Sequence, residues 1–291
     1  MKQHKYILWF NEVNKQDTSL VGGKGSSLGE MFSIMPIPNG FCITVAAYKE
    51  VLKDHHNEFL NILKGRNIES LEELEAVANI IKTKIHNVHI PNHIEQEIKD
   101  SYKKMQGKVA VRSSATTEDL DEASFAGQQD TFLNIEGESA VIDAVKKCWA
   151  SLFNARAIHY REKNNFEHDQ AFLSVVIQKM VNADTAGVMF TMNPINKSND
   201  EMIIEACFGL GEKLVSGEIT PDTFIINKKQ ENIKQEYLNF DKRTVSLKEL
   251  KALIELGKKI EAHYNKPMDI EWAIENEKIC ILQARPITTI Q

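Results

Sequence analysis

The chain has 291 residues, of which 42% are hydrophobic and 26% are charged, an ordinary globular composition with enough material for one large domain or two lobes. Its net charge of −6 comes from interspersed acidic and basic residues, which excludes binding to nucleic acid or to an anionic membrane through a broad basic surface. No stretch is apolar for long enough to span a bilayer or to act as a signal sequence, and four isolated cysteines indicate free thiols, so we expect a cytoplasmic protein.

The first third of the chain predicts two short strands and several helices. Residues 6–10 and 40–45 have the apolar pattern of short strands, and "LVGGKGSSLGEM" lies between them at 20–31. Backbone amides and the lysine ammonium of this segment could hold a phosphate, although its spacing is not the G-x-x-x-x-G-K-[ST] of a P-loop. From about 46 to 105 the apolar residues recur at helical spacing.

Residues 108–135 predict a compact strand, a long polar loop and a second strand. The strand "KVAVRSS" places Arg112 near its end, and hydroxyl side chains follow it. Such residues beyond a strand can form an anion-binding nest or cap a helix. Because a polar loop of this length in a compact domain is usually functional or disordered, and its aromatic and apolar residues disfavour disorder, we expect a ligand-binding loop; a plain surface loop is the alternative.

A helix over 140–163 and the apolar run "SVVIQKMV" at 174–181 come next. The simplest interpretation of the run is a buried central strand, and the alternative is a strand whose end reads the edge of a planar base. We expect a hinge near 180–185, which divides an N-terminal lobe, about 1–181, from a C-terminal lobe, about 182–291. The C-terminal lobe is predicted to contain strand-like segments near 186–194, 201–217 and 223–229, a polar surface segment at 228–244, a helix at 246–264 and a terminal hairpin.

The terminal hairpin, "MDIEWAIENEKICILQARP", carries acidic and basic residues on one face. Strand alternation puts Asp269 and Glu271 on the same side, and a three-residue loop "NEK" would place Glu271 opposite Gln283 and Asp269 opposite Arg285. Carboxylate and amide oxygens suit Mg2+, and an arginine beside them can bind the same phosphates. A solvated strand face with an Asp–Arg pair is the other interpretation, and the hairpin alone does not decide between them.

Six segments, taken in order, resemble one protein family. They are "VGGKGSSLGEM", "VAVRSSATTEDLDEASFAGQQDTFLNI", "CWASLFNARAIHYRE", "VVIQKMV", "FGLGEKLVSGEITPD" and "DIEWAIENEKICILQARPITT". From about residue 7 to 289 the chain is similar to the N-terminal nucleotide-binding domain of the phosphoenolpyruvate synthase, pyruvate phosphate dikinase and rifampicin phosphotransferase family. The resemblance implies an α+β chain with an ATP-grasp-type, two-lobed fold that binds ATP and Mg2+.

The resemblance also implies roles for individual residues. The catalytic cations would be Lys24, Arg112 and Arg285. The metal ligands would be Glu271 and Gln283, with Asp269 of the D-I-E motif beside them. The implied nucleotide-binding residues are Lys24, Arg112, Ser113, Gly127, Thr131, Gln178, Lys179, Met180, Val181 and Arg285.

The implied function is dikinase-type phosphotransfer, in which a histidine attacks the β-phosphate of ATP and leaves AMP and a pyrophosphoryl-histidine. Full-length members carry that histidine on a swivelling domain, and no histidine of this chain has the expected glycine-rich setting. The histidine domain and the acceptor-substrate domain are therefore expected as partners on another polypeptide or outside this sequence. The alternatives are the ATP-binding domain of a rifampicin phosphotransferase-like kinase and a non-catalytic ATP-sensing module. The presence of all the implied phosphate- and metal-binding residues favours an enzyme.

Overall fold

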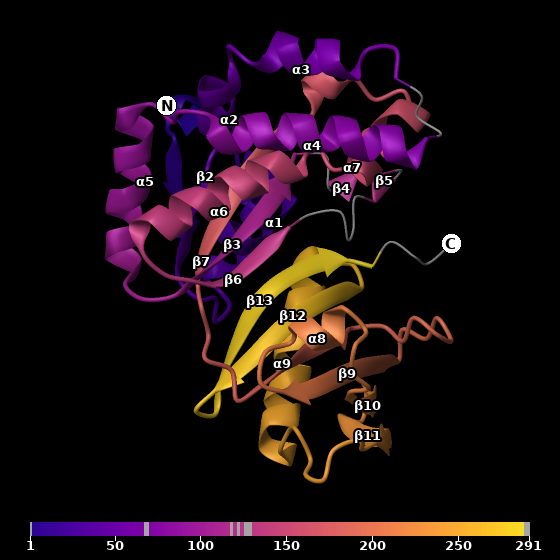
Figure 1. The fold of residues 1–291 in the computed structure, drawn as a ribbon. Coiled ribbons are helices and arrows are strands. Elements are labelled where there is room, and N and C mark those ends of the chain that lie inside the picture. The colour runs from indigo at the N-terminus through magenta and orange to yellow at the C-terminus, as the bar shows by residue number, and fades with distance from the viewer. Residues whose placement is uncertain (1, 67–69, 117–118, 121–122, 125–129, 288–291) are drawn as a thin grey trace. The chain divides into compact units, whose positions relative to one another are not determined.

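The computed structural model describes residues 2–66, 70–116, 119–120, 123–124 and 130–287. The chain divides into two compact units, one made of residues 1–30 and 39–180 and the other of residues 31–38 and 181–291 (Figure 1). Each unit combines helices with a sheet of its own, so the chain is α+β. The functional lobes at about 1–181 and 182–291 stay a prediction.

The sheet of the first unit has five antiparallel strands in the order β1-β2-β7-β3-β6. The strand β7 lies at its centre and is buried along all but its last residue, because its apolar side chains face protein on both sides. This confirms the simplest interpretation of the apolar run at 174–181. The strands are β1 (Ile7–Trp9), β2 (Gly40–Ile43), β3 (Val109–Ala115), β6 (Thr131–Ile135) and β7 (Leu173–Lys179), with the short pair β4 (Asp119–Leu120) and β5 (Ala123–Ser124) separate from them.

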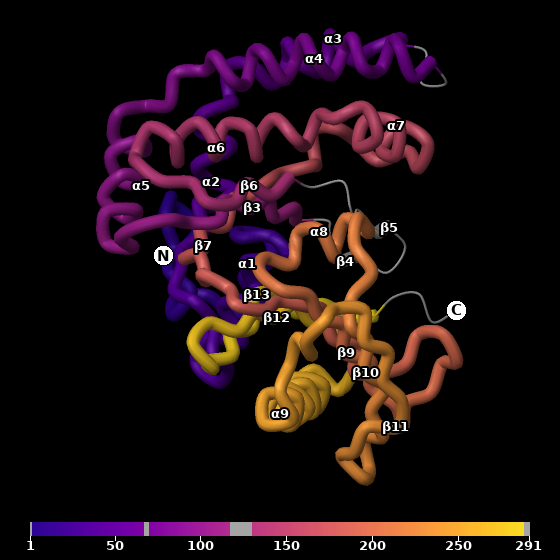
Figure 2. The backbone as a smooth tube through the Cα atoms, turned by 60° about the horizontal axis from the view of Figure 1, so that its bottom comes forward, coloured from indigo at the N-terminus to yellow at the C-terminus, as the bar shows by residue number. Residues whose placement is uncertain are grey.

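Helices pack on one face of this sheet and form the larger core. Figure 2 shows α4 and α6 side by side, and residues of both helices belong to that core. The single helix predicted over 140–163 is two helices, because the side chain of Asn154 accepts a hydrogen bond from the Ala157 amide and caps a new helix. The helices are α2 (Val45–Leu52), α3 (His56–Leu63), α4 (Leu71–Asn87), α5 (Asn92–Met105), α6 (Glu138–Ser151) and α7 (Ala155–Lys163).

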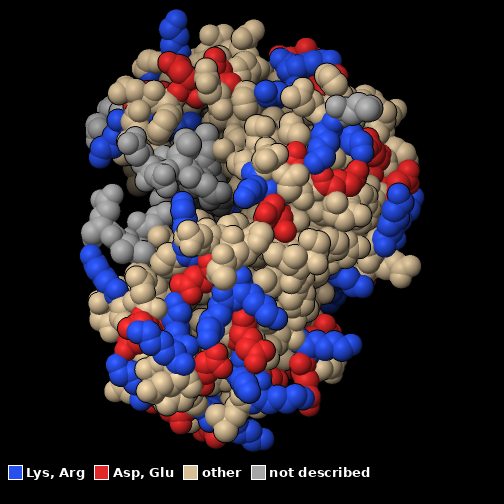
Figure 3. All heavy atoms as spheres, turned by 180° about the vertical axis from the view of Figure 1, so that it is seen from behind, with Lys and Arg blue, Asp and Glu red and all other residues tan. Residues whose placement is uncertain are grey.

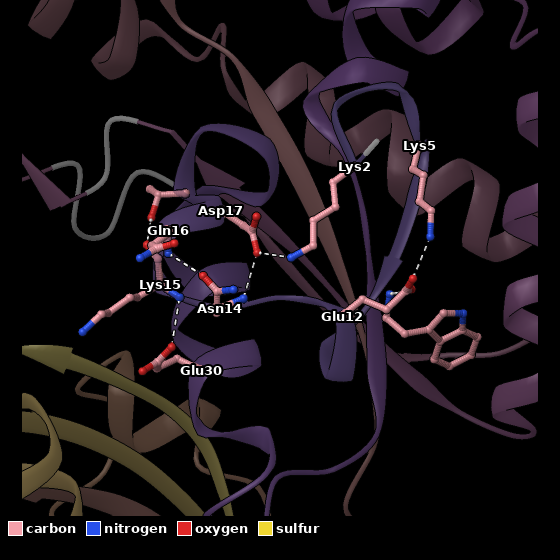
Figure 4. A network of polar contacts seen from close by, with 10 residues as sticks. Lys2, Lys5, Glu12, Asn14, Lys15, Gln16, Asp17 and Glu30 are labelled. Atoms are coloured by element: carbon pink, nitrogen blue, oxygen red, sulfur yellow. Dashed lines mark hydrogen bonds and ion pairs between the residues drawn. The ribbon is translucent and has the colours of Figure 1, made fainter.

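The helix α1 (Thr18–Phe32) carries the glycine-rich segment and is interrupted at Gly22. Polar contacts fix the chain just before it (Figure 4). The Asp17 carboxylate accepts hydrogen bonds from Nζ of Lys2 and from the Asn14 amide, each at 2.9 Å. The Lys15 amide donates to the carboxylate of Glu30 at 3.1 Å, within the first unit. The start of the glycine-rich segment is therefore held in place by hydrogen bonds.

The second unit contains a six-stranded antiparallel sheet in the order β11-β10-β9-β8-β12-β13. The helix α9 (Leu247–Tyr264) covers one face, and its apolar residues share a core with those of the sheet and of segment 31–38. The polar segment at 228–244 contains an exposed edge strand, β11, which the sequence did not predict. The remaining elements are β8 (Thr185–Phe190), β9 (Glu201–Phe208), α8 (Glu212–Val215), β10 (Asp222–Asn227), β11 (Asn232–Tyr237), β12 (Met268–Glu275) and β13 (Lys278–Pro286).

Charged side chains of both signs are interspersed on the face shown in Figure 3. Among the described residues, no helix combines the length and the apolar character that crossing a membrane requires.

Candidate functional site

The glycine-rich segment forms a break within α1. Gly22 has φ 71° and ψ 176°, outside the helical region, and a Cβ atom there would lie 2.3 Å from both the carbonyl oxygen and the hydroxyl of Ser114. Glycine is therefore required twice, by the backbone conformation and by the close approach of β3. Lys24 is half-buried and stands in the first turn after the break. The amides of that turn form a helix N-terminus, which favours anions.

Two buried polar side chains meet on one face of the first unit's sheet. Arg112 and Gln178 are 6% and 2% exposed, and Nη1 of Arg112 donates a hydrogen bond to Oε1 of Gln178 at 3.2 Å. Nε2 of Gln178 has no hydrogen-bond partner among the residues that the structure describes. Leaving such a donor unsatisfied costs about 1–3 kcal/mol. An acceptor on a bound ligand would remove that cost.

Ser113, the residue after Arg112 in β3, ties Asp130 to this strand. It is fully buried, and its amide and hydroxyl both donate to the carbonyl oxygen of Asp130, each at 3.1 Å. Thr131 follows, exposed, opposite Arg112 in the β3–β6 ladder. Gly127 lies outside the described residues. The ligand contacts predicted for Ser113, Gly127 and Thr131 stay predictions.

Two backbone amides that follow Gln178 already donate hydrogen bonds within the protein. The amides of Lys179 and Met180 donate to backbone carbonyl groups at 2.8 and 3.0 Å. The Lys179 side chain is exposed, whereas Val181 is buried in a small apolar cluster of the second unit. Recognition of a base edge by this segment would therefore use the Gln178 side chain and backbone groups other than these two amides.

The hairpin of the second unit brings four predicted side chains onto one face. In the β12–β13 ladder Glu271 lies opposite Gln283, and Asp269 lies opposite Arg285, which confirms the predicted register. Nε and Nη2 of Arg285 both lie beside Oδ2 of Asp269, at 2.9 and 2.8 Å. Burial raises the pKa of Asp269, while the guanidinium acts in the opposite direction. The Asp269 carboxylate thus holds Arg285 on the strand face that carries Glu271 and Gln283.

The turn of this hairpin is shorter than the sequence predicted. Pairing continues to the ends of both strands and leaves a two-residue turn, Asn276 and Glu277, with φ 49° and 63°. The predicted three-residue loop is therefore wrong. The register at the site is nevertheless the predicted one, because a bulge between Glu271 and Trp272 shifts the pairing by one residue.

Glu205 is a carboxylate of the same face that the sequence pattern did not single out. It lies opposite Val188 of β8, which in turn lies opposite Glu271, and residues paired in this way project to one side of a sheet. Glu205 is half-buried, and burial raises its pKa. An acidic residue in the middle of the otherwise apolar run of β9 is the signal that could have identified it.

The oxygen donors of the hairpin fit magnesium bound to a nucleotide. Among the described residues there is no group of three or more His, Cys, Asp or Glu side chains that could hold a metal ion. Mg2+ commonly takes one or two protein oxygens and completes its shell with water and phosphate oxygens. Glu271 and Gln283, paired across the two strands, could supply two hard oxygen ligands of that kind.

A comparison with protein families identifies the family of this chain. The family model described as "Pyruvate phosphate dikinase, AMP/ATP-binding domain" matches residues 18–245 and 238–291. The chain belongs to this family. It is therefore an AMP/ATP-binding domain, and the resemblance carried by its six ordered segments is confirmed.

Curated relatives cover nearly the whole chain. A probable phosphoenolpyruvate synthase of Methanocaldococcus jannaschii is 42% identical over 320 residues, which cover 99% of this chain and 27% of the relative. The phosphoenolpyruvate synthase of Pyrococcus furiosus is 38% identical over 361 residues, which cover 99% of this chain and 44% of the relative. A probable phosphoenolpyruvate synthase of Archaeoglobus fulgidus is 43% identical over 316 residues, covering 98% and 42%. The chain thus spans less than half the length of these relatives.

Solved structures match this chain at low similarity. The D-alanine–D-alanine ligase of Helicobacter pylori has a TM-score of 0.34 and 11% identity, and the match covers 74% of this chain and 54% of the ligase. A similarity this low supports no statement about function.

Proposed function

We propose that this chain is the ATP-binding module of a dikinase-type phosphotransferase of the phosphoenolpyruvate synthase kind, with an ATP-grasp-type fold that binds Mg-ATP. The observation that carries the proposal is the Glu271–Gln283 pair, with Arg285 held on the same face by Asp269. Membership of an AMP/ATP-binding family supports the nucleotide, and the names of the relatives support the reaction class.

The cationic side chains would act on the phosphates. Lys24, Arg112 and Arg285 would bind phosphate oxygens and offset the negative charge that develops during transfer, since phosphoryl transfer depends mainly on positioning and electrostatics. Glu271 and Gln283 would hold Mg2+, which would supply positive charge to offset the negative charge of the phosphates. Asp269 would position Arg285 and stand beside the metal.

The remaining predicted residues would hold the nucleotide in place. Gln178 would offer its unsatisfied amide donor to the nucleotide, and the segment from Lys179 to Val181 would line the base through Met180 and its neighbours. Ser113, Gly127 and Thr131 would shape the loop beside the phosphates.

The proposed reaction forms a nitrogen–phosphorus bond. A histidine imidazole nitrogen attacks the β-phosphorus of ATP, and the bond from that phosphorus to the oxygen bridging the α-phosphate breaks. AMP leaves with that oxygen, and the histidine carries a pyrophosphoryl group. Loss of the terminal phosphate to water leaves a phosphoryl group for pyruvate. The greater length of the relatives supports placing the histidine and the pyruvate site on other domains.

Radiolabel transfer tests the proposal directly. The chain is mixed with a histidine domain from a full-length relative and with ATP labelled at either the β- or the γ-phosphate. Both labels are expected on the histidine, because the group transferred is pyrophosphoryl. Glu271→Ala and Arg285→Ala should each reduce transfer by at least about 100-fold while circular dichroism stays unchanged.

Glu275→Ala is the matched control, since it removes a carboxylate from the same strand beyond the proposed site. Its transfer rate should stay within about twofold of the unmodified chain. Near-normal transfer by both the Glu271 and the Arg285 variants would contradict the assignment. Tight ATP binding without transfer of either label would instead identify an ATP-sensing module.

A further inference from the structure

The break in α1 has a specific partner on β3. In an uninterrupted α-helix the amide of Gly25 would donate to the carbonyl oxygen of Val21, four residues earlier. Here the hydroxyl of Ser114 replaces both partners of that hydrogen bond. It donates to the Val21 carbonyl at 2.8 Å and accepts from the Gly25 amide at 3.1 Å. A side chain from another element is thus inserted into the helical hydrogen-bond ladder, which is a recognised cause of kinks.

The insertion is buried and sterically matched. Ser114 is fully buried, and both of its hydrogen bonds join segments about 90 residues apart in sequence, with separations of 93 and 89. Gly22 allows the approach, since a Cβ atom there would lie 2.3 Å from the Ser114 hydroxyl. The turn at 22–25 can therefore take this shape only when it is docked on β3.

The same strand carries Arg112. Residues two apart in a strand project to the same face and lie about 6.8 Å apart, so Arg112 and Ser114 share one face of β3. Lys24 is in the turn that Ser114 binds. Ser114 therefore links the backbone that carries Lys24 to the strand that carries Arg112.

We propose that Ser114 is a positioning residue for ATP binding: by bridging Val21 and Gly25 it fixes Lys24 relative to Arg112, without touching the nucleotide itself. The proposal rests on the proposed function, in which Lys24 and Arg112 bind the phosphates. It assigns the second serine of "VRSS" to the glycine-rich turn, whereas the first serine anchors Asp130.

The cross-strand neighbour Ser174 provides a matched control. It lies opposite Ser114 in the β3–β7 ladder, is fully buried, and its hydroxyl donates to the Ile43 carbonyl at 2.8 Å. Ser174 therefore has the same chemistry and burial as Ser114, but it binds a segment without a proposed phosphate ligand. Removing the hydroxyl should lower stability in both variants, and more at Ser114, because its hydroxyl both donates and accepts whereas that of Ser174 donates to Ile43.

The test measures binding of the Mg2+ complex of a non-hydrolysable ATP analogue by calorimetry. We expect Ser114→Ala to weaken binding about tenfold and Ser174→Ala to change it less than about twofold, although both variants lose thermal stability. In the Lys24→Ala background, Ser114→Ala should cause no further loss, because residues that act through one another are not additive. Should Ser114→Ala fail to fold, Ser114→Cys keeps a similar shape with a weaker donor and acceptor and should show a smaller loss of the same kind.

Unchanged affinity in a folded Ser114 variant would overturn the positioning role. An equal loss in the presence and absence of Lys24 would overturn it as well, since Ser114 would then act independently of the lysine. If Lys24→Ala alone leaves affinity unchanged, the proposed role of Lys24 in phosphate binding is refuted. This result distinguishes failure of the proposed function from failure of the inference about Ser114.

Discussion

Replacing Gly22 by alanine separates the two reasons for a glycine in the break of α1. Gly22 has φ 71° and lies against Ser114. Gly107, in the same unit, has φ 82°, and a Cβ added there would meet no described atom within 4 Å beyond its chain neighbours. Gly107→Ala therefore introduces only the conformational strain. Gly22→Ala introduces strain at φ 71° and ψ 176°, a conformation essentially restricted to glycine, together with a collision against the backbone of β3.

The structure indicates how much stability each variant should lose. A non-glycine residue held at a sparsely populated positive φ costs about 1–3 kcal/mol, and this is the whole cost expected for Gly107→Ala. At Gly22 the new Cβ would lie 2.3 Å from the carbonyl oxygen and hydroxyl of Ser114, so the turn must move away from β3. That movement breaks the two hydrogen bonds of the buried Ser114 hydroxyl, at about 1 kcal/mol or more each. We expect a total loss of about 3–5 kcal/mol for Gly22→Ala.

Guanidinium denaturation followed by tryptophan fluorescence measures both losses, because the buried Trp149 reports on the core of the first unit. Gly22→Ala should lower the free energy of unfolding by about 2–3 kcal/mol more than Gly107→Ala. Equal losses for the two variants would show that the close approach of β3 is unimportant. The inference about Ser114 would then lose its structural basis.

Two further predictions concern groups away from the proposed site. His168 accepts a hydrogen bond at Nδ1 from Nε of Arg161 at 2.8 Å, and burial, with Arg161 next, lowers its pKa below the ordinary value of 6.5. Its contribution to stability should therefore be complete above about pH 6.5 and be lost as the pH falls toward the folded-state pKa. His168→Gln should flatten the dependence of Tm on pH between about 7 and 5, and an unchanged slope would contradict this. The buried Asp222 carboxylate accepts hydrogen bonds from the Asn239 amide and from the amide and hydroxyl of Thr244, at 2.7, 3.0 and 2.8 Å. Asp222→Ala should lower the free energy of unfolding by about 3 kcal/mol, against less than about 0.5 for the exposed Asp200→Ala, and similar losses would refute the anchoring role.

Periodicity in the sequence was enough to predict elements that bury one clear face. The strand β7 and the helices α4 and α9 lie where their apolar patterns placed them. The register at the hairpin was predictable for a similar reason: Ile270 and Trp272 must face the core, so a slip by one residue would expose them. The turn was not predictable in this way, because the bulge between Glu271 and Trp272 that offsets it leaves no local sequence signal.

The glycine-rich segment shows why local patterns could not complete the site. Its spacing suggested a phosphate loop, yet the conformation of Gly22 is determined by a serine that comes 92 residues later. The hydrogen bonds of Ser114 replace a contact internal to α1, so the helix cannot be understood without β3. "GGKG" and "VRSS" are therefore two halves of one structural feature. It follows that a substitution at Gly22 and one at Ser114 should both displace Lys24 relative to Arg112. The double variant should lose less free energy of unfolding than the sum of the two single losses.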